Sequence, residues 1–131
     1  MCERRLTVNN TIIVVDDDET FSGLLKTVFE LEGYQVVLVP HPGEVVPQVR
    51  AVRPVLLLMD VHTKKGDTLG VLRELRADES LNDVVIVMTS GMDRSAECLA
   101  AGADDFILKP FHPDELITMV KGLLARSDAA A

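Results

Sequence analysis

The run Val55-Leu56-Leu57-Leu58-Met59, followed by Asp60, restricts the possible folds of this chain more than any other stretch. Five consecutive apolar residues predict a strand buried on both faces, which is typical of a parallel sheet covered by helices. In open α/β sheets, ligands bind beyond the carboxyl ends of the strands, so Asp60 is a candidate site residue. An Asp in this place also commonly begins a turn, and this strand alone does not decide between the two interpretations.

The rest of the chain alternates between apolar runs of strand length and stretches with apolar residues at three- and four-residue steps. The predicted strands are residues 11–15, 35–39, 55–59, 84–88 and 106–108. The predicted helices run from residue 20 to a stop at Gly33, then over 45–52, 69–75 and 94–101, and from 113 onward. This alternation predicts an α/β fold with a single doubly wound (βα)5 domain and a parallel sheet between two helical layers. We expect a loose lead-in over residues 1–10, the domain over 11–126, and a frayed, Ala-rich tail over 127–131.

Charge and composition exclude several classes of protein. A net charge of −8 argues against direct nucleic-acid binding by this domain, because such binding depends on Lys and Arg neutralising phosphates. No apolar run is long enough to cross a membrane, and the charged start leads into no signal-peptide core. Cys2 and Cys98 provide no disulfide framework. We therefore expect a cytoplasmic protein with no membrane partner.

Polar residues follow four of the five predicted strands, and the ends of parallel strands share one edge of a sheet. Clustered carboxylates bind Mg²⁺, Asp is a competent nucleophile for an aspartyl phosphate, and a lysine and a hydroxyl can hold the other phosphoryl oxygens. Taken singly, the acidic run can cap a helix, the hydroxyl can cap the next one, and the lysine can be solvated. Their joint arrangement favours a phosphoryl-transfer site. The residues are Asp16, Asp17, Asp18, Asp60, Thr89, Ser90 and Lys109.

The chain also resembles the response-regulator receiver domains of two-component signal transduction, the CheY-like family. The resemblance covers nearly the whole chain. It is carried by Val14-Val15-Asp16-Asp17, Leu57-Leu58-Met59-Asp60, Met88-Thr89-Ser90 and, most specifically, Gly102-Ala103-Asp104-Asp105-Phe106-Ile107-Leu108-Lys109-Pro110-Phe111. It implies a flavodoxin-like sheet in the order 2-1-3-4-5.

For the site, the resemblance implies that Asp60 accepts a phosphoryl group from the phosphohistidine of a sensor histidine kinase or phosphotransfer protein. Asp17 and Asp60 would bind Mg²⁺ directly with the main-chain carbonyl of His62, and Asp16 would hold a metal-bound water. The hydroxyl of Thr89 or Ser90 and the ammonium of Lys109 would contact the phosphoryl group. The domain would also hydrolyse its own phosphate, so it would act as a self-limiting switch rather than as a conventional enzyme.

For signalling, the resemblance implies an output face made of the fourth helix, the fifth strand and the fifth helix, on which receivers often dimerise when phosphorylated. Phe106 matches the aromatic switch position, and the Lys109-Pro110 bond matches a bond that is commonly cis in the family.

Three features depart from the family pattern. The loop over residues 62–68 lacks the usual proline and final glycine and contains Lys64 and Lys65. The stretch from the hydroxyl to the lysine is short, which predicts a short or displaced fourth helix. Because of this shortening, Thr89 and Ser90 both remain candidates for the hydroxyl residue. Thr89 is favoured because residues 85–89 then align with the family's strand without a shift in register. Phe106 lacks the hydroxyl of a tyrosine, so switching there would depend on packing.

Two alternatives belong to other functional classes. Asp16-x-Asp18-x-Thr20 after an apolar strand also fits a haloacid-dehalogenase-like phosphatase, with Asp16 as the nucleophile and Asp18 as the acid/base. That family, however, would need an acidic pair after Lys109, and only Asp114-Glu115 follows it, inside a predicted helix. The other alternative is a protein-interaction scaffold that works without phosphorylation, and the altered 62–68 loop is the only feature that favours it.

Overall fold

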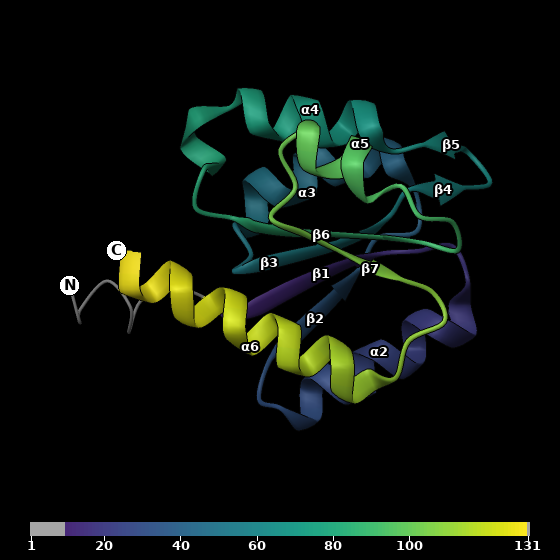
Figure 1. The fold of residues 1–131 in the computed structure, drawn as a ribbon, viewed down its shortest axis with the longest axis vertical. Helices are drawn as coiled ribbons and strands as arrows, with labels where there is room; N and C mark the ends of the chain where they lie inside the picture. The colour runs from purple at the N-terminus through teal and green to yellow at the C-terminus, as the bar shows by residue number, and fades with distance from the viewer. Residues whose placement is uncertain (1–9, 131) are drawn as a thin grey trace.

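In the computed structural model, which describes residues 10–130, a five-stranded parallel sheet lies between two layers of helices (Figure 1). The strand order is β2-β1-β3-β6-β7. Leaving out the short strands β4 and β5, this is the predicted order 2-1-3-4-5, and the predicted fold class is confirmed. The strands are β1 (Thr11–Val15), β2 (Gln35–Leu38), β3 (Leu56–Asp60), β6 (Val85–Ser90) and β7 (Asp105–Leu108).

Helices α2 (Glu19–Leu31) and α6 (Pro113–Ala130) cover one face of the sheet (Figure 1). Helices α3 (Val45–Val52), α4 (Leu69–Ala77) and α5 (Ser95–Ala100) cover the other, with single 3₁₀ turns at Pro42–Glu44 and Glu79–Leu81. The six-residue α5 agrees with the short helix predicted there. None of the helices in the described part of the chain is long and apolar enough to cross a bilayer.

The predicted lead-in and tail lie partly outside the described residues 10–130. Of the expected lead-in, only residue 10 belongs to the described residues. At the other end, α6 continues through Ala130, so most of the stretch predicted as a frayed tail has a helical backbone.

The sheet separates two apolar cores, and the alternation of strand residues assigns each side chain to one of them. Leu56 and Leu58 of β3 pack toward α2 and α6, whereas Leu57 and Met59 pack toward α3, α4 and α5. All five residues of β3 are buried. This confirms a strand covered on both faces, with Asp60 as its last residue.

Helix α2 has sequence-encoded signals at both ends. The carboxylate of Asp18 accepts a hydrogen bond from the amide of Phe21 at 3.1 Å and so caps the first turn. After the last turn, Gly33 adopts a φ of +96°, which glycine reaches without steric cost. The predicted stop at Gly33 is therefore confirmed.

A small hairpin follows β3, where the sequence predicted only a loop. Strands β4 (His62–Thr63) and β5 (Gly66–Asp67) pair in antiparallel fashion. Strands of two residues have no readable period, and for that reason the pattern did not predict them. The fourth predicted strand also extends beyond its expected end at Met88, since Thr89 and Ser90 pair with β7.

Candidate functional site

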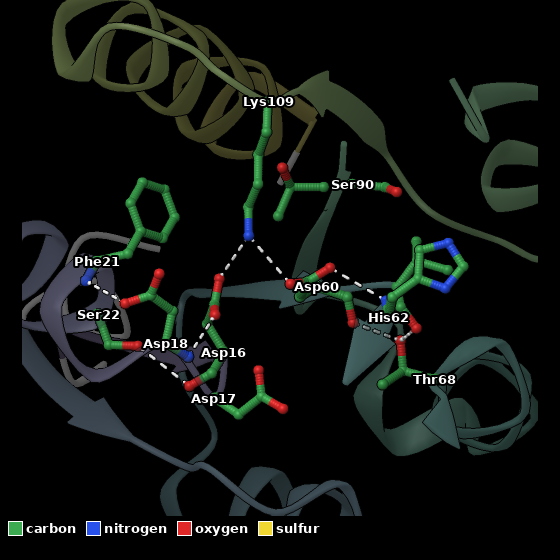
Figure 2. Close-up of polar contacts among 12 residues, drawn as sticks. Asp16, Asp17, Asp18, Phe21, Ser22, Asp60, His62, Thr68, Ser90 and Lys109 are labelled. Atoms are coloured by element: carbon green, nitrogen blue, oxygen red, sulfur yellow. Dashed lines mark hydrogen bonds and ion pairs between the residues drawn. The ribbon is translucent and has the colours of Figure 1, made fainter. Parts of the chain in front are cut away.

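Asp60 lies at the carboxyl end of the central strand and is bound on three sides (Figure 2). Its Oδ2 accepts a hydrogen bond from Lys109 Nζ at 3.0 Å, and its Oδ1 accepts one from the His62 amide at 3.1 Å. The fully buried Thr68 donates its hydroxyl to the Asp60 carbonyl at 2.8 Å. The carboxylate is thus held in one orientation, with 11% of the side chain exposed.

Lys109 joins residues that are far apart in the sequence. Its Nζ lies 2.8 Å from Asp16 Oδ2 and 3.0 Å from Asp60 Oδ2, and Figure 2 shows it directed between the two carboxylates. The lysine follows β7, and its amide donates to the Ser90 carbonyl at 2.8 Å. The peptide bond between Lys109 and Pro110 is cis, as predicted.

The ammonium of Lys109 stays charged in this setting. Burial acts to lower the pKa of Lys109, but its hydrogen bonds with Asp16 and Asp60 outweigh burial and hold the pKa above its ordinary value. The same Nζ lies 4.8 Å from the centroid of the Phe21 ring, a cation–π contact. Two carboxylates and one aromatic face therefore fix a single positive charge beside Asp60.

The acidic run after β1 divides into three roles. Asp16 is buried, its Oδ1 accepts from the Asp18 amide at 2.9 Å, and its carbonyl accepts from the Ser22 hydroxyl at 3.1 Å. Asp17 Oδ2 accepts from the amide of Lys64, at the tip of the hairpin, at 2.6 Å. Asp18 caps α2, so the helix-capping interpretation holds for this member of the run.

Asp60, Asp16 and Lys109 are in direct contact, while the hydrogen bond of the Asp17 carboxylate goes to the hairpin instead. Within the part of the chain that the structure describes, no group of three or more His, Cys, Asp or Glu side chains is placed to hold a metal ion. The predicted ligand set needs fewer side chains than that, since it combines two carboxylates with a main-chain carbonyl. The three carboxylates and one ammonium leave two net negative charges, and hard oxygens of this kind suit Mg²⁺.

The alternation of the sheet distinguishes Thr89 from Ser90. Thr89 is paired with Asp60 across β3 and β6. It continues the series of Val85 and Val87, which pack toward α2 and α6, the face to which Asp60 also belongs. Ser90 belongs to the opposite series, and its Oγ accepts from the Met92 amide at 3.1 Å. The buried Thr89 hydroxyl donates to the Ile107 carbonyl of β7 at 2.7 Å.

Phe106 lies on the other side of the sheet from Lys109. Its ring is partly buried against the core beneath α3, α4 and α5. Its neighbour Ile107, whose carbonyl accepts the Thr89 hydroxyl, packs into the core beneath α2 and α6. The backbone of β7 thus links the hydroxyl on one face with the aromatic ring on the other.

Sequence reasoning missed the site contacts of Phe21 and Arg94. The apolar periodicity from residue 20 onward places Phe21 only on the apolar face of a helix, and its contact with Lys109 depends on two elements meeting in space. Arg94 was predicted only as the start of a helix. Its guanidinium binds His62 and Asp67 of the hairpin and Glu97 of α5. No spacing signal in the sequence identifies such a contact.

Comparisons with known proteins agree with this geometry. Residues 12–121 match the family described as response regulator receiver domain. The chain is 34% identical over 122 residues to the DNA-binding response regulator MtrA of Mycobacterium tuberculosis, covering 93% of this chain and 54% of MtrA. It is 33% identical over 126 residues to the alkaline phosphatase synthesis transcriptional regulatory protein PhoP of Bacillus subtilis, covering 95% and 52%. The chain therefore spans about half the length of these relatives.

Among solved structures, a receiver domain protein of Methanospirillum hungatei superposes with a TM-score of 0.85 at 25% identity, covering 94% of this chain and 99% of that one. The family match, the relatives and the fold all agree with the resemblance stated from the sequence motifs. This chain belongs to the response-regulator receiver domain family of two-component systems.

Proposed function

We propose that this domain is a phosphorylation switch in which Asp60 accepts a phosphoryl group from the phosphohistidine of a histidine kinase or phosphotransfer protein. The observation that carries the proposal is the bridge from Lys109 Nζ to Asp60 and Asp16 at the end of the central strand. In the reaction an Asp60 oxygen forms a bond to phosphorus as the phosphorus–nitrogen bond of the donor breaks. The electron pair of that bond returns to the imidazole nitrogen of the donor.

The residues around Asp60 have distinct tasks in this proposal. Lys109 stabilises the negative charge of the phosphoryl oxygens, for which its ammonium is already in place. The amide of His62 orients the carboxylate through Oδ1, and Oδ2, the oxygen that faces the Lys109 ammonium, is the attacking atom in this proposal. Thr89 is the hydroxyl we propose as the phosphoryl ligand, because it shares a face of the sheet with Asp60 and Ser90 does not.

We propose Mg²⁺ as the metal of this site, as the receiver family uses it. Asp17, Asp60 and the main-chain carbonyl of His62 would hold the ion, and Asp16 would orient one of its waters. When bound, Mg²⁺ offsets the negative charge that the phosphoryl oxygens bring to the site. The excess negative charge and the oxygen-only donors of the three carboxylates support this assignment.

The phosphorylation signal would be transmitted to partners through the face formed by α5, β7 and α6. If the Thr89 hydroxyl leaves the Ile107 carbonyl to bond a phosphoryl oxygen, β7 loses a contact and the Phe106 ring on its other face can repack. Leu99 and Leu108 are exposed on this face at 49% and 47%, which supports its use as a docking or homodimer surface after phosphorylation. In a longer regulator of the MtrA kind, this face would control a DNA-binding output.

The test uses acetyl phosphate as the phosphodonor in the presence of Mg²⁺, with intact-protein mass spectrometry as the readout. Wild type should gain one phosphoryl group and Asp60→Asn should gain none. Asp83→Asn is the matched control. Asp83 is an exposed aspartate that precedes β6, at the amino-terminal ends of the strands, away from Asp60. An Asp60→Asn protein that labels like wild type would rule out the assignment.

Two added readouts separate the two alternatives: peptide mapping, which locates the phosphoryl group, and binding of a histidine kinase to the wild-type protein. A phosphoryl group found on Asp16 would support a phosphatase-like nucleophile. A wild-type protein that binds a kinase but is never labelled would support a scaffold. The contact of Asp16 with Lys109 alone does not favour either of them, because the receiver assignment uses that contact as well.

A further inference from the structure

We infer that Arg94 is a positioning residue that couples the hairpin beside Asp60 to helix α5. This inference rests on the proposed function, since it concerns how a change at Asp60 is transmitted. It adds a second connection to the output face, separate from the one through Thr89 and Phe106. We call Arg94 with its three partners, His62, Asp67 and Glu97, the Arg94 clamp.

The Arg94 clamp joins three segments through one guanidinium. Arg94 binds Glu97 in bidentate fashion, with Nε at 2.7 Å from Oε1 and Nη2 at 2.9 Å from Oε2. Its Nη2 lies 3.3 Å from Asp67 Oδ2, and its Nη1 lies 3.0 Å from His62 Nε2. Because a guanidinium only donates, His62 Nε2 is the acceptor in this bond. The hairpin contributes a partner from each strand, and α5 contributes the third.

The opposite side of the hairpin is bonded to the phosphoacceptor site. The His62 amide donates to Asp60 Oδ1, and the Lys64 amide donates to Asp17 Oδ2. Phosphorylation converts the Asp60 carboxylate into an acyl phosphate, whose remaining carboxyl oxygen carries much less negative charge. The hydrogen bond from the His62 amide must weaken or move to a phosphoryl oxygen. His62 therefore contacts the reacting carboxylate with its backbone and Arg94 with its ring.

An exposed ion pair alone would be weak evidence for such a role. Here the geometry is bidentate toward Glu97, and only 18% of the Arg94 side chain is exposed. Helix α5 packs against β7 but inserts only one side chain, that of Cys98, fully into the core. A clamp that supplies several of the contacts of a short helix can change its position when the other end of the clamp moves.

The test is hydrogen–deuterium exchange of the amides of α5, with and without beryllofluoride and Mg²⁺ as a mimic of phosphorylated Asp60. In Arg94→Gln without beryllofluoride, exchange over α5 should be about two- to fivefold faster than in wild type, the range expected for a surface ion-pair cluster. Beryllofluoride should then change α5 exchange in wild type but have less effect in the variant. Glu97→Gln cuts only the helix arm of the clamp and should weaken the response in the same way.

Arg50→Gln is the matched control, because it removes another surface ion pair, with Asp78 at 3.1 Å, that involves neither the hairpin nor α5. It should exchange over α5 like wild type. Arg94 contacts neither Asp60 nor Lys109 directly, so Asp60 should still be labelled by acetyl phosphate in Arg94→Gln, at a rate that is slowed only through the lost bond to His62.

Wild-type exchange over α5 in Arg94→Gln, both with and without beryllofluoride, would overturn the inference, as would an equal effect of Arg50→Gln. If wild type itself is not labelled by acetyl phosphate, the proposed function fails, while the exchange without beryllofluoride still tests the clamp on its own.

Discussion

Replacing Gly102 with alanine tests the packing that supports the end of the sheet. Gly102 follows α5 with a φ of +110°, and an added Cβ would lie 2.5 Å from Cγ of Arg76. An L-residue in a left-handed conformation costs roughly 1–2 kcal/mol. The clash also displaces Arg76, whose Nε donates to the Gly102 carbonyl at 2.7 Å and whose Nη2 contacts Asp104 at 2.6 Å. Losing these bonds costs about 1–2 kcal/mol more, so we expect a loss of about 2–4 kcal/mol in the free energy of unfolding.

Alanine substitutions at two other glycines separate the cost of the left-handed backbone from the cost of displacing Arg76, when unfolding is measured in urea. Gly33 also has a positive φ, but its Cβ would meet nothing within 4 Å, so Gly33→Ala should cost only the conformational part, about 1–2 kcal/mol. Gly23 lies inside α2 with free space around it, so Gly23→Ala should stabilise by about 0.5–1 kcal/mol. A Gly102→Ala protein no less stable than Gly33→Ala would refute the contribution assigned to Arg76.

Three further predictions concern single side chains. Phe21→Leu removes the ring from beside Lys109 and should slow acetyl phosphate labelling about two- to fivefold, the range of an exposed cation–π contact. Phe21→Tyr keeps an aromatic ring and should keep the wild-type rate. Equal rates in both variants would contradict a role for the ring. Phe106→Ala should preserve labelling of Asp60 and reduce the beryllofluoride response of the output face; loss of labelling would mean that Phe106 is structural core. Burial raises the pKa of the Cys98 thiol, so native protein should resist iodoacetamide at Cys98, as judged by peptide mapping, and rapid alkylation would argue against the packing of α5. The unfolded thiol loses its proton as the pH passes its ordinary pKa of 9.0, whereas the folded thiol, with its raised pKa, loses it only at a higher pH. Stability should therefore fall as the pH rises past 9.0, and Cys98→Ala should lack this component of the fall.

The sequence predicted the architecture well because its elements obey simple periods. The run from Leu56 to Met59 predicted a strand covered on both faces, and the alternation of strands and helices predicted a parallel sheet between two helical layers. The order of the strands was implied by the resemblance to receiver domains. The residues at the strand ends could then be assigned to one edge, and the contact of Lys109 with Asp16 and Asp60 follows from that edge.

The details that sequence reasoning did not reach depend on register and on short-range geometry. Choosing between Thr89 and Ser90 requires knowing which of them shares a face with Asp60, and only the pairing of β3 with β6 supplies this. The carboxylate of Asp17 turns to the Lys64 amide because a hairpin forms at residues 62–67, and strands of two residues have no pattern. The Arg94 clamp joins parts of the chain that no motif relates.

The most direct test of the central claim traps the acyl phosphate in the wild-type protein. After acetyl phosphate and Mg²⁺, borohydride reduction converts a phosphorylated aspartate into homoserine, and peptide mass spectrometry identifies its position. Homoserine at residue 60 is the predicted result, as expected if Lys109 and the His62 amide orient the Asp60 carboxylate for attack. Homoserine at residue 16, or its absence from every peptide, would contradict the account.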